Sequence, residues 1–146
     1  MIHHLFAVAG NPVLHSRSPE IFNAAFASLE IDATYTRIAA SSAEGILEIA
    51  KGMPIEGLNI TSPFKEEIAS LVETDEDAKE IGAVNTLVSN GSGGFLGRNT
   101  DWMGAISALE NSNAKIKNNN AVVLGAGGAA SAAAYGLLKK GAKVTI

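Results

Sequence analysis

The chain has 146 residues, of which 47% are hydrophobic and 18% are charged, and these values fit a globular protein of one full domain plus a remainder. It contains no cysteine, which excludes disulfides and thiolate metal sites and favours a reducing cytoplasm. The opening segment MIHHLFAVAG has no basic leader, and its apolar run is too short for a signal peptide or a membrane span. We therefore expect a cytoplasmic protein that has no membrane partner.

Charge is distributed unevenly along the chain. Residues 1–110 carry all 15 acids and six of the 11 bases, a net charge of -9, whereas residues 111–146 carry five lysines and no acid. The change coincides with NSNAKIKNNN at 111–120, a polar stretch typical of linkers. We predict one domain over 1–110, a linker over 111–120 and the start of a second domain over 121–146. The lysines have no interleaved aromatic residues, which speaks against nucleic-acid binding.

Apolar periodicity and turn residues predict strands that alternate with helices. Before the linker we expect strands at 2–10, 33–40, 55–60, 82–89 and 93–99, and helices from 19 onward, at 42–52, in two short pieces within 63–81, and at 100–110. The last two strands are joined by the turn NGSGG. After the linker the order is strand, glycine turn, helix, strand. This alternation predicts an α/β domain with a largely parallel sheet, followed by the first βαβ unit of a Rossmann-type domain.

The glycine turn follows the apolar strand AVVL and opens a helix. Gly125, Gly127 and Ala130 fit the pattern G-x-G-x-x-[GA], in which backbone amides approach a dinucleotide pyrophosphate at the positive end of the helix. An ordinary tight βα turn is the alternative. The residue that reads the ribose is expected about 20 residues further on, where the chain ends at Ile146. We therefore expect a piece of a longer protein, one that lacks the element separating NAD from NADP.

The stretch HSRSPE at 15–20 predicts a polar helix start. Ser18 can cap the helix, Pro19 suits its first turn and Glu20 complements its dipole. Capping leaves Ser16 unexplained, and two hydroxyls beside free helix amides make a site for a carboxylate. Capping combined with a polar loop remains the alternative.

A second polar stretch, NITSPFK at 59–65, follows an apolar strand. Ser62 and Pro63 predict another helix start, which places Lys65 in the first helical turn. A cation there opposes the helix dipole, and a lysine in such a setting can serve as a general acid or base. A solvated surface lysine is the alternative.

Two more polar clusters follow apolar strand positions. They are AVNT, with Asn85 and Thr86, and GRNTDWMG, with Asn99, Thr100 and Asp101. Helix capping by Asn99 or Thr100 would explain the second cluster without any function. However, all four clusters follow strands of one parallel-type sheet, so they should converge on its carboxyl edge, where α/β folds bind ligands.

Five segments in this order and spacing resemble shikimate dehydrogenase, and the likeness covers essentially the whole chain: GNPVLHSRSPEIFN, NITSPFK, IGAVNT, GRNTDWMG and GAGGAA. The resemblance implies an oxidoreductase that reversibly reduces 3-dehydroshikimate to shikimate with NADPH, in the pathway to chorismate and the aromatic amino acids. It also implies a first domain that binds substrate and a second that binds NADP, with no metal. A homodimer is left open.

The resemblance also assigns roles to individual residues. It implies that the substrate carboxylate is held by Ser16 and Ser18, and that Lys65 and Asp101 form the catalytic pair. It implies contacts with the ring hydroxyls from Asn59, Thr61, Asn85 and Asp101. It places against the cofactor Gly125, Gly127, Gly128 and Ala129.

One position departs from the family pattern. Ser131 stands where the family commonly has an arginine, and the residues that would complete the pocket and read the NADP phosphate lie beyond Ile146. We therefore expect the parent protein to be an enzyme and the 146-residue chain to have little or no activity. Two alternatives stay open, namely an NAD-preferring quinate or shikimate dehydrogenase and a non-catalytic module that binds substrate without turnover.

Overall fold

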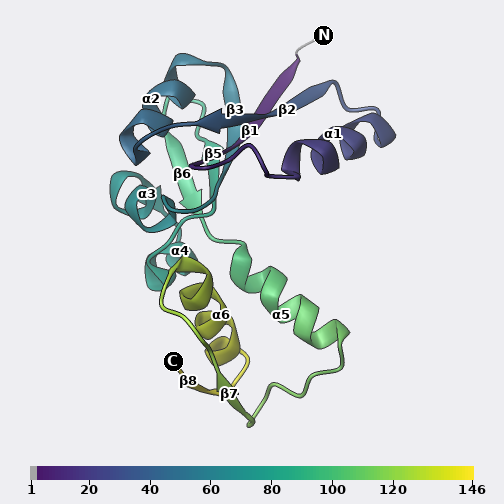
Figure 1. Ribbon diagram of the computed structural model, residues 1–146, viewed down its shortest axis with the longest axis vertical. Helices are drawn as coiled ribbons and strands as arrows, with labels where there is room; N and C mark the ends of the chain where they lie inside the picture. Colours follow the sequence, from purple (N-terminus) through teal and green to yellow (C-terminus); the bar gives the residue numbers. More distant parts are fainter. Residues whose placement is uncertain (1–2) are drawn as a thin grey trace.

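The structure is a computed structural model that describes residues 3–146 (Figure 1). A six-stranded sheet with the order β2-β1-β3-β5-β6-β4 forms its larger part, and a two-stranded sheet, β7-β8, lies at the other end. The elements are, in chain order, β1 (His4–Gly10), α1 (Ser18–Ser28), β2 (Ala33–Ala39), α2 (Ala43–Gly52), β3 (Ile55–Ile60), α3 (Lys65–Leu71), β4 (Glu73–Thr74), α4 (Glu76–Ile81), β5 (Thr86–Ser89), β6 (Phe95–Arg98), α5 (Asp101–Asn111), β7 (Asn120–Val122), α6 (Gly128–Lys139) and β8 (Lys143–Thr145).

The predicted alternation of strands and helices is confirmed, with differences at several ends. The first strand begins at His4, and residue 2 of the predicted span lies outside the described residues. Helix α2 begins after Ser42, whose hydroxyl accepts the Gly45 N–H at 3.1 Å as an N-cap. The short strand β4 was not predicted, because two residues carry no periodicity.

The prediction of a largely parallel sheet needs one correction. Strands β1, β2 and β3 pair in parallel, as do β4 and β6, but β5 runs antiparallel to both β3 and β6. The cause is local, since the tight turn at 90–94 joins β5 directly to β6 and so makes an antiparallel hairpin. The reversal brings the start of β5 to the edge where β3 and β6 end.

Helices cover the two faces of the six-stranded sheet unequally. Helices α2 and α3 pack on one face, where Ile46, Ile60 and Ile68 belong to the main buried core (Figure 1). Helix α1 lies on the opposite face and contacts it mainly through Phe22 and Phe26. Ile21 of α1 and its C-cap residue Leu29 are largely exposed.

The second sheet is a parallel pair linked by helix α6. Strand β7 pairs with β8, and α6 connects them, which is the predicted βαβ unit. The predicted linker overlaps both neighbours, because α5 extends to Asn111 and β7 begins at Asn120. Ile106 of α5 and Leu137 of α6 share a buried cluster, so these two helices pack together. Among residues 3–146, no helix has both the length and the apolar character that a membrane crossing requires.

Candidate active site

Four chain segments meet at one edge of the six-stranded sheet. Strands β1, β3 and β6 all end there, and the antiparallel strand β5 begins there. The segments that follow or precede these strand ends carry the polar clusters found in the sequence. The sheet topology therefore brings these clusters to a common edge.

Lys65 and Asp101 form an ion pair at this edge. Their Nζ and Oδ2 atoms lie 2.5 Å apart, and the side chains are 21% and 31% exposed. Lys65 is the first residue of α3 and Asp101 is the first residue of α5, so each side chain projects from a helix start. The main chain of Lys65 is anchored as well, because its carbonyl accepts the Val84 N–H at 2.8 Å. The amine is therefore held in a defined place rather than free in solvent.

Asn85 connects this pair to the neighbouring strands. Its amide nitrogen donates to Asp101 Oδ1 at 2.7 Å and to Thr100 Oγ1 at 2.9 Å. Its amide oxygen accepts the Thr100 N–H at 2.9 Å. Asn85 is itself buried. These bonds fix the Asp101 carboxylate, which in turn fixes the direction of the Lys65 amine.

Asn99 has a structural role beside this network. It is only 2% exposed, donates to the Ala83 carbonyl at 2.9 Å, and accepts the Asp101 N–H at 3.0 Å. Thr100 occupies the N-cap position of α5 but makes no side-chain capping bond. The predicted side-chain cap of α5 is therefore absent, although Asn99, one residue before the N-cap, binds the N–H of the first helical residue.

Tyr35 links the next predicted residue, Asn59, to the loop that carries Ser16 and Ser18, called the serine loop below. Its hydroxyl donates to Asn59 Oδ1 at 2.6 Å, and Asn59 Nδ2 donates to Thr86 Oγ1 at 3.3 Å. Burial raises the pKa of Tyr35 to about 12, against which a hydrogen bond with Ser18 acts. The Tyr35 ring stacks on Phe22 with the centroids 4.4 Å apart. Sequence reasoning missed Tyr35, although a tyrosine on a half-buried strand is a signal for a hydroxyl that needs a partner.

Ser16 and Ser18 lie side by side at the start of helix α1. Their hydroxyl oxygens are 3.2 Å apart, and Ser16 Oγ accepts the Ser18 N–H at 3.3 Å. Ser18 was predicted to cap α1, and this is wrong. It is the first helical residue, the N-cap position is Arg17, and no side chain caps the helix. The Ser18 hydroxyl is thus left for other contacts.

Arg37 holds the serine loop against the sheet. Its guanidinium Nε donates to the Ser16 carbonyl at 3.1 Å, and the same group pairs with Glu20 at 3.0 Å. Arg37 lies on β2, two residues beyond Tyr35. The sequence offered no signal for it, because a single arginine on a strand reads as a solvated edge residue.

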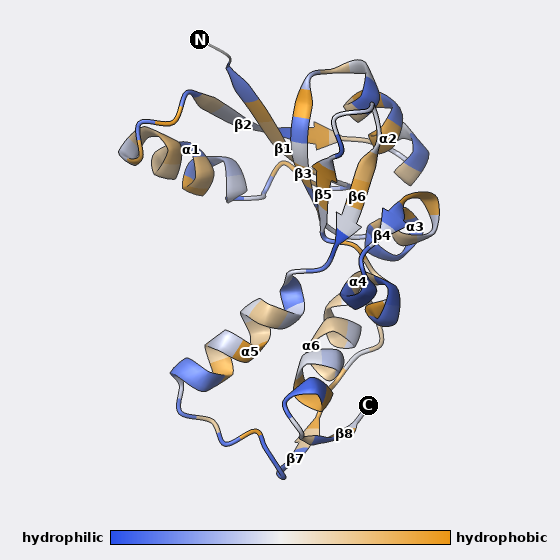
Figure 2. Cartoon of the chain, turned by 180° about the vertical axis from the view of Figure 1, so that it is seen from behind, coloured by the Kyte–Doolittle hydropathy of each residue, from blue (hydrophilic) through white to orange (hydrophobic). Residues whose placement is uncertain are grey.

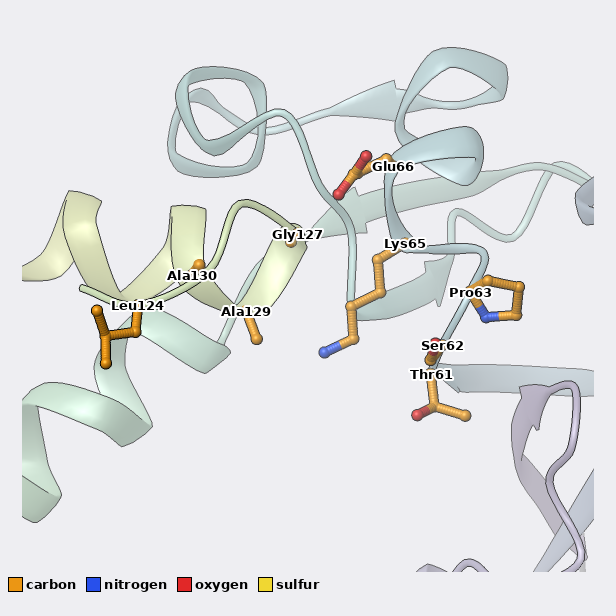
Figure 3. Close-up of a pocket in the computed structure, with 10 residues that line it drawn as sticks. Thr61, Ser62, Pro63, Lys65, Glu66, Leu124, Gly127, Ala129 and Ala130 are labelled. Carbon is orange, nitrogen blue, oxygen red and sulfur yellow. The ribbon is translucent and has the colours of Figure 1, made fainter. Parts of the chain in front are cut away.

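Thr61 and Lys65 line a pocket of about 500 Å³. Figure 3 shows the Lys65 amine reaching into the space between Thr61 and Ala129. Thr61 is placed by its N–H bond to the Ala9 carbonyl at 2.9 Å and by the close approach of Gly10. A Cβ at Gly10 would collide with the Thr61 side chain, so only glycine fits there. The pocket thus begins at the same edge as the ion pair.

The glycine turn forms the opposite wall of this pocket. Gly127, Gly128 and Ala129 line it at the start of α6, whereas Gly125 makes the turn at a φ of +133° and is not part of the wall. Pro63 was predicted to open helix α3, and this is wrong, because the helix starts only at Lys65. Ser62 and Pro63 instead form the floor of the pocket beside Lys65. A βα turn and an amine therefore face each other across one cavity.

The arrangement is suited to proton transfer next to a bound dinucleotide. A fixed lysine amine can give a proton to an oxygen or take one from it, and the carboxylate of Asp101 stabilises its charged form. The free amides at the start of the 12-residue helix α6 are suited to a pyrophosphate. Within residues 3–146 no three His, Asp or Glu side chains gather into a metal site.

The comparisons with known proteins point in one direction. Residues 8–87 match the model of the family described as the shikimate dehydrogenase substrate binding domain. The chain is 46% identical, over 143 residues, to the shikimate dehydrogenase (NADP(+)) of Syntrophobacter fumaroxidans, which covers 97% of this chain and 49% of that protein. The chain spans about half the length of the curated relatives it matches.

Solved structures agree with this likeness. The crystal structure of shikimate dehydrogenase from Aquifex aeolicus superposes with a TM-score of 0.91 at 40% identity, covering 99% of this chain and 56% of that one. The enzyme from Thermus thermophilus in complex with NADP(H) and shikimate gives a TM-score of 0.85 at 33% identity, covering 97% and 54%. The α/β fold class predicted from the sequence is thereby confirmed.

Proposed function

This chain belongs to the shikimate dehydrogenase family, and on that premise we propose that it supplies the substrate-binding and catalytic half of an enzyme that reversibly reduces 3-dehydroshikimate to shikimate with NADPH. The observation that carries this function is the Lys65–Asp101 ion pair, which opens on the same pocket as the glycine turn of α6. Together they place a proton donor beside a dinucleotide site.

Lys65 is the proton donor in this scheme. NADPH, when bound, supplies the hydride that reaches the carbonyl carbon of 3-dehydroshikimate. The Lys65 ammonium then gives its proton to the carbonyl oxygen, which becomes the alcohol, and in the reverse direction the neutral amine takes that proton back. Asp101 orients Lys65 and stabilises its charged form, while Asn85 holds Asp101 in place. The proton and hydride arrive on opposite atoms of one C=O bond, so the step is balanced.

The remaining predicted residues bind the substrate. The adjacent hydroxyls of Ser16 and Ser18 suit its carboxylate, and the side chains of Asn59, Thr61 and Asn85 suit its ring hydroxyls. Tyr35 touches Asn59 and fixes which way its amide points, so we assign it a positioning role. The ligand would thus be held at both ends while its carbonyl faces Lys65.

The turn at the start of α6 would hold the cofactor. The residues present fit this role, since Gly127, Gly128 and Ala129 line the pocket at the start of α6, where no side chain caps the first helix amides. The specificity for NADP is carried over from the relatives. We propose the domain division that was predicted from the sequence. Residues 1–110 form the substrate domain, 111–120 the linker and 121–146 the start of the NADP domain. A cytoplasmic location is proposed because the chain contains no cysteine, and assembly as a homodimer stays an open alternative.

Two measurements test this function. Calorimetric titration of the 146-residue chain with shikimate should show saturable binding, because every predicted substrate residue lies within it. An absorbance assay at the nicotinamide band, with shikimate and NADP+, should show little turnover by this chain and clear turnover by the chain extended to the length of its relatives. Absence of both binding and turnover would contradict the assignment. Turnover only with NAD+ or quinate, or binding without turnover in the extended protein, would select one of the alternatives.

A further inference from the structure

A cluster of three polar side chains joins helix α6 to helix α4, away from the pocket. Asp77 Oδ1 accepts hydrogen bonds from the Tyr135 hydroxyl at 2.5 Å and from Lys139 Nζ at 2.7 Å. Lys139 Nζ also donates to the Tyr135 hydroxyl at 2.9 Å, which closes a triangle. In Figure 2, α4 is among the most hydrophilic elements, and it lies directly beside α6. Asp77 is 58 residues from Tyr135 in sequence, so the cluster ties two distant parts of the chain.

Trp102 forms the base of this cluster and immediately follows Asp101. The Lys139 amine lies 4.8 Å from the centre of the Trp102 ring, a cation–π distance. The Tyr135 ring meets Trp102 edge-on with the centroids 5.6 Å apart. Trp102 Nε1 is buried without a hydrogen-bond partner among the described residues. The cluster is therefore in direct contact with the residue next to the catalytic carboxylate.

The other end of α6 lies close to Lys65. A Cβ built on Gly128 would lie 3.0 Å from Ala83 Cβ and 3.5 Å from Lys65 Cβ. Ala83 comes one residue after Gly82, the left-handed residue that ends α4. Helix α4 and the residues just after it therefore contact α6 in two ways, through the bonds of Asp77 to Tyr135 and Lys139 and through the burial of Ile81 and Ala83 against Ala132.

We propose that Asp77, Tyr135 and Lys139 are positioning residues that set the distance between the glycine turn and the Lys65–Asp101 pair. This role rests on the proposed function, because the turn and the pair must hold cofactor and substrate within reach of each other. Hydrogen bonds from Lys139 and Tyr135 lower the pKa of Asp77, and the bond to Asp77 raises the pKa of Lys139. The carboxylate and the ammonium are therefore both charged at neutral pH, and charge-assisted bonds are the stronger kind.

The first test measures geometry and needs no activity. Since the chain has no cysteine, Glu67→Cys on α3 and Ala129→Cys on α6 introduce two thiols for spin labels at exposed positions. We expect a narrow label-to-label distance distribution by pulsed electron paramagnetic resonance, and a broader or shifted one when Asp77→Asn or Tyr135→Phe is added. Tyr135→Phe retains the aromatic packing and guards against a variant that fails to fold. Lys140→Gln is the matched control, because Lys140 pairs with Glu110 of α5 at 2.8 Å instead of with α4.

The second test uses kinetics of the chain extended to the length of its relatives. Asp77→Asn and Tyr135→Phe should lower kcat by about 10- to 100-fold, since a misplacement of about 1 Å far from the chemistry can cost about 100-fold. KM for shikimate should stay nearly unchanged, because the substrate residues do not touch the cluster. Lys140→Gln should retain normal kcat.

The outcomes separate this role from the proposed function. An unchanged distance distribution in both cluster variants would overturn the positioning role whether or not the protein is a dehydrogenase. A wild-type extended protein without turnover would overturn the proposed function, while the distance measurement would still decide whether the cluster fixes α6. A rise in KM as large as the fall in kcat, or an equal fall in kcat from Lys140→Gln, would indicate general destabilisation. Either result would also overturn the positioning role.

Discussion

The Lys65 amine and the Asp101 carboxylate lie 2.5 Å apart although 36 residues separate them in the chain. Each is the first residue of a helix, one after β3 and one after β6, and these strands end at the same edge of the sheet. The pair is therefore a product of topology and not of local sequence. Its position beside the glycine turn is the reason for the chemical role proposed for it.

Removal of the Lys65 amine should abolish most of the turnover. In the protein extended to the length of its relatives, we expect Lys65→Ala to lower kcat by about 100- to 10,000-fold, the usual worth of a positioned acid or base, with a smaller effect on KM. Steady-state kinetics with shikimate and NADP+ measure both values. Lys51→Ala, an exposed lysine on α2, is the control and should retain full activity. Near-normal turnover by Lys65→Ala would reject the proton-donor role.

The paired serines should contribute to substrate affinity. Ser16→Ala or Ser18→Ala each removes one hydroxyl from the predicted carboxylate site, and a hydrogen bond to a charged group is worth about 1.5–3 kcal/mol. Calorimetric titration of the 146-residue chain with shikimate should therefore show a weaker Kd for each variant. Ser70→Ala is a suitable control, because the Ser70 hydroxyl is exposed and bonds only to the Glu67 carbonyl of its own helix. If both site variants bind as tightly as the wild type, the carboxylate assignment is wrong.

Much of the fold could be predicted because its signals are local. Helix α2 and the hairpin turn before β6 follow from apolar periodicity, a serine cap and a run of glycines. The direction of β5 was missed although its short turn implied it. The strand β4 could not be found, since two residues show no pattern.

In the candidate site, too, the residues with a local signal in the sequence could be predicted and the others could not. Lys65, Asn85 and Asp101 could be named because polar residues after apolar strands stand out in the sequence. Tyr35 gave only the weak signal of a tyrosine on a half-buried strand and Arg37 gave none, because their partners Asn59 and Ser16 lie 24 and 21 residues away in the chain. The Asp77 cluster was invisible for the same reason. Its members lie on two helices, and apolar periodicity within each helix does not show that the two helices pack together.

The buried Tyr35 hydroxyl should make stability depend on alkaline pH. Its pKa is raised from 10.0 to about 12 in the folded chain, so the folded state keeps this proton where the unfolded state has lost it. The contribution of the protonated Tyr35 hydroxyl to the free energy of unfolding is fully present below pH 10 and is lost as the pH rises toward 12. Tyr35→Phe removes this dependence, and it also costs about 1–3 kcal/mol near neutral pH because Asn59 Oδ1 loses its donor.

Urea unfolding of the wild type and Tyr35→Phe at about pH 8 and about pH 11 measures this effect. Between these two pH values we expect the free energy of unfolding to fall more for the wild type than for Tyr35→Phe. The difference in stability between the two proteins should therefore become smaller at the higher pH. Tyr135, the other tyrosine of the chain, is present in both proteins and cancels in the comparison. Equal losses in both proteins would show that the Tyr35 hydroxyl is not buried.

The packing of α5 against α6 predicts opposite effects for one substitution at two neighbouring sites. A Cβ on Gly136 would lie 2.8 Å from Ile106 Cγ1 and 3.2 Å from the Trp102 carbonyl oxygen, and neither atom can move away freely. Gly136→Ala should therefore destabilise the chain by about 1–3 kcal/mol through overpacking, offset only in part by the better helix propensity of alanine. Gly104 lies inside α5 with no atom within 4 Å of its Cβ position. Gly104→Ala should stabilise by about 0.5–1 kcal/mol, since alanine loses less backbone entropy on folding. Thermal unfolding of the two variants should thus shift Tm in opposite directions, and a rise in Tm for both would mean that α5 and α6 do not cross at Gly136.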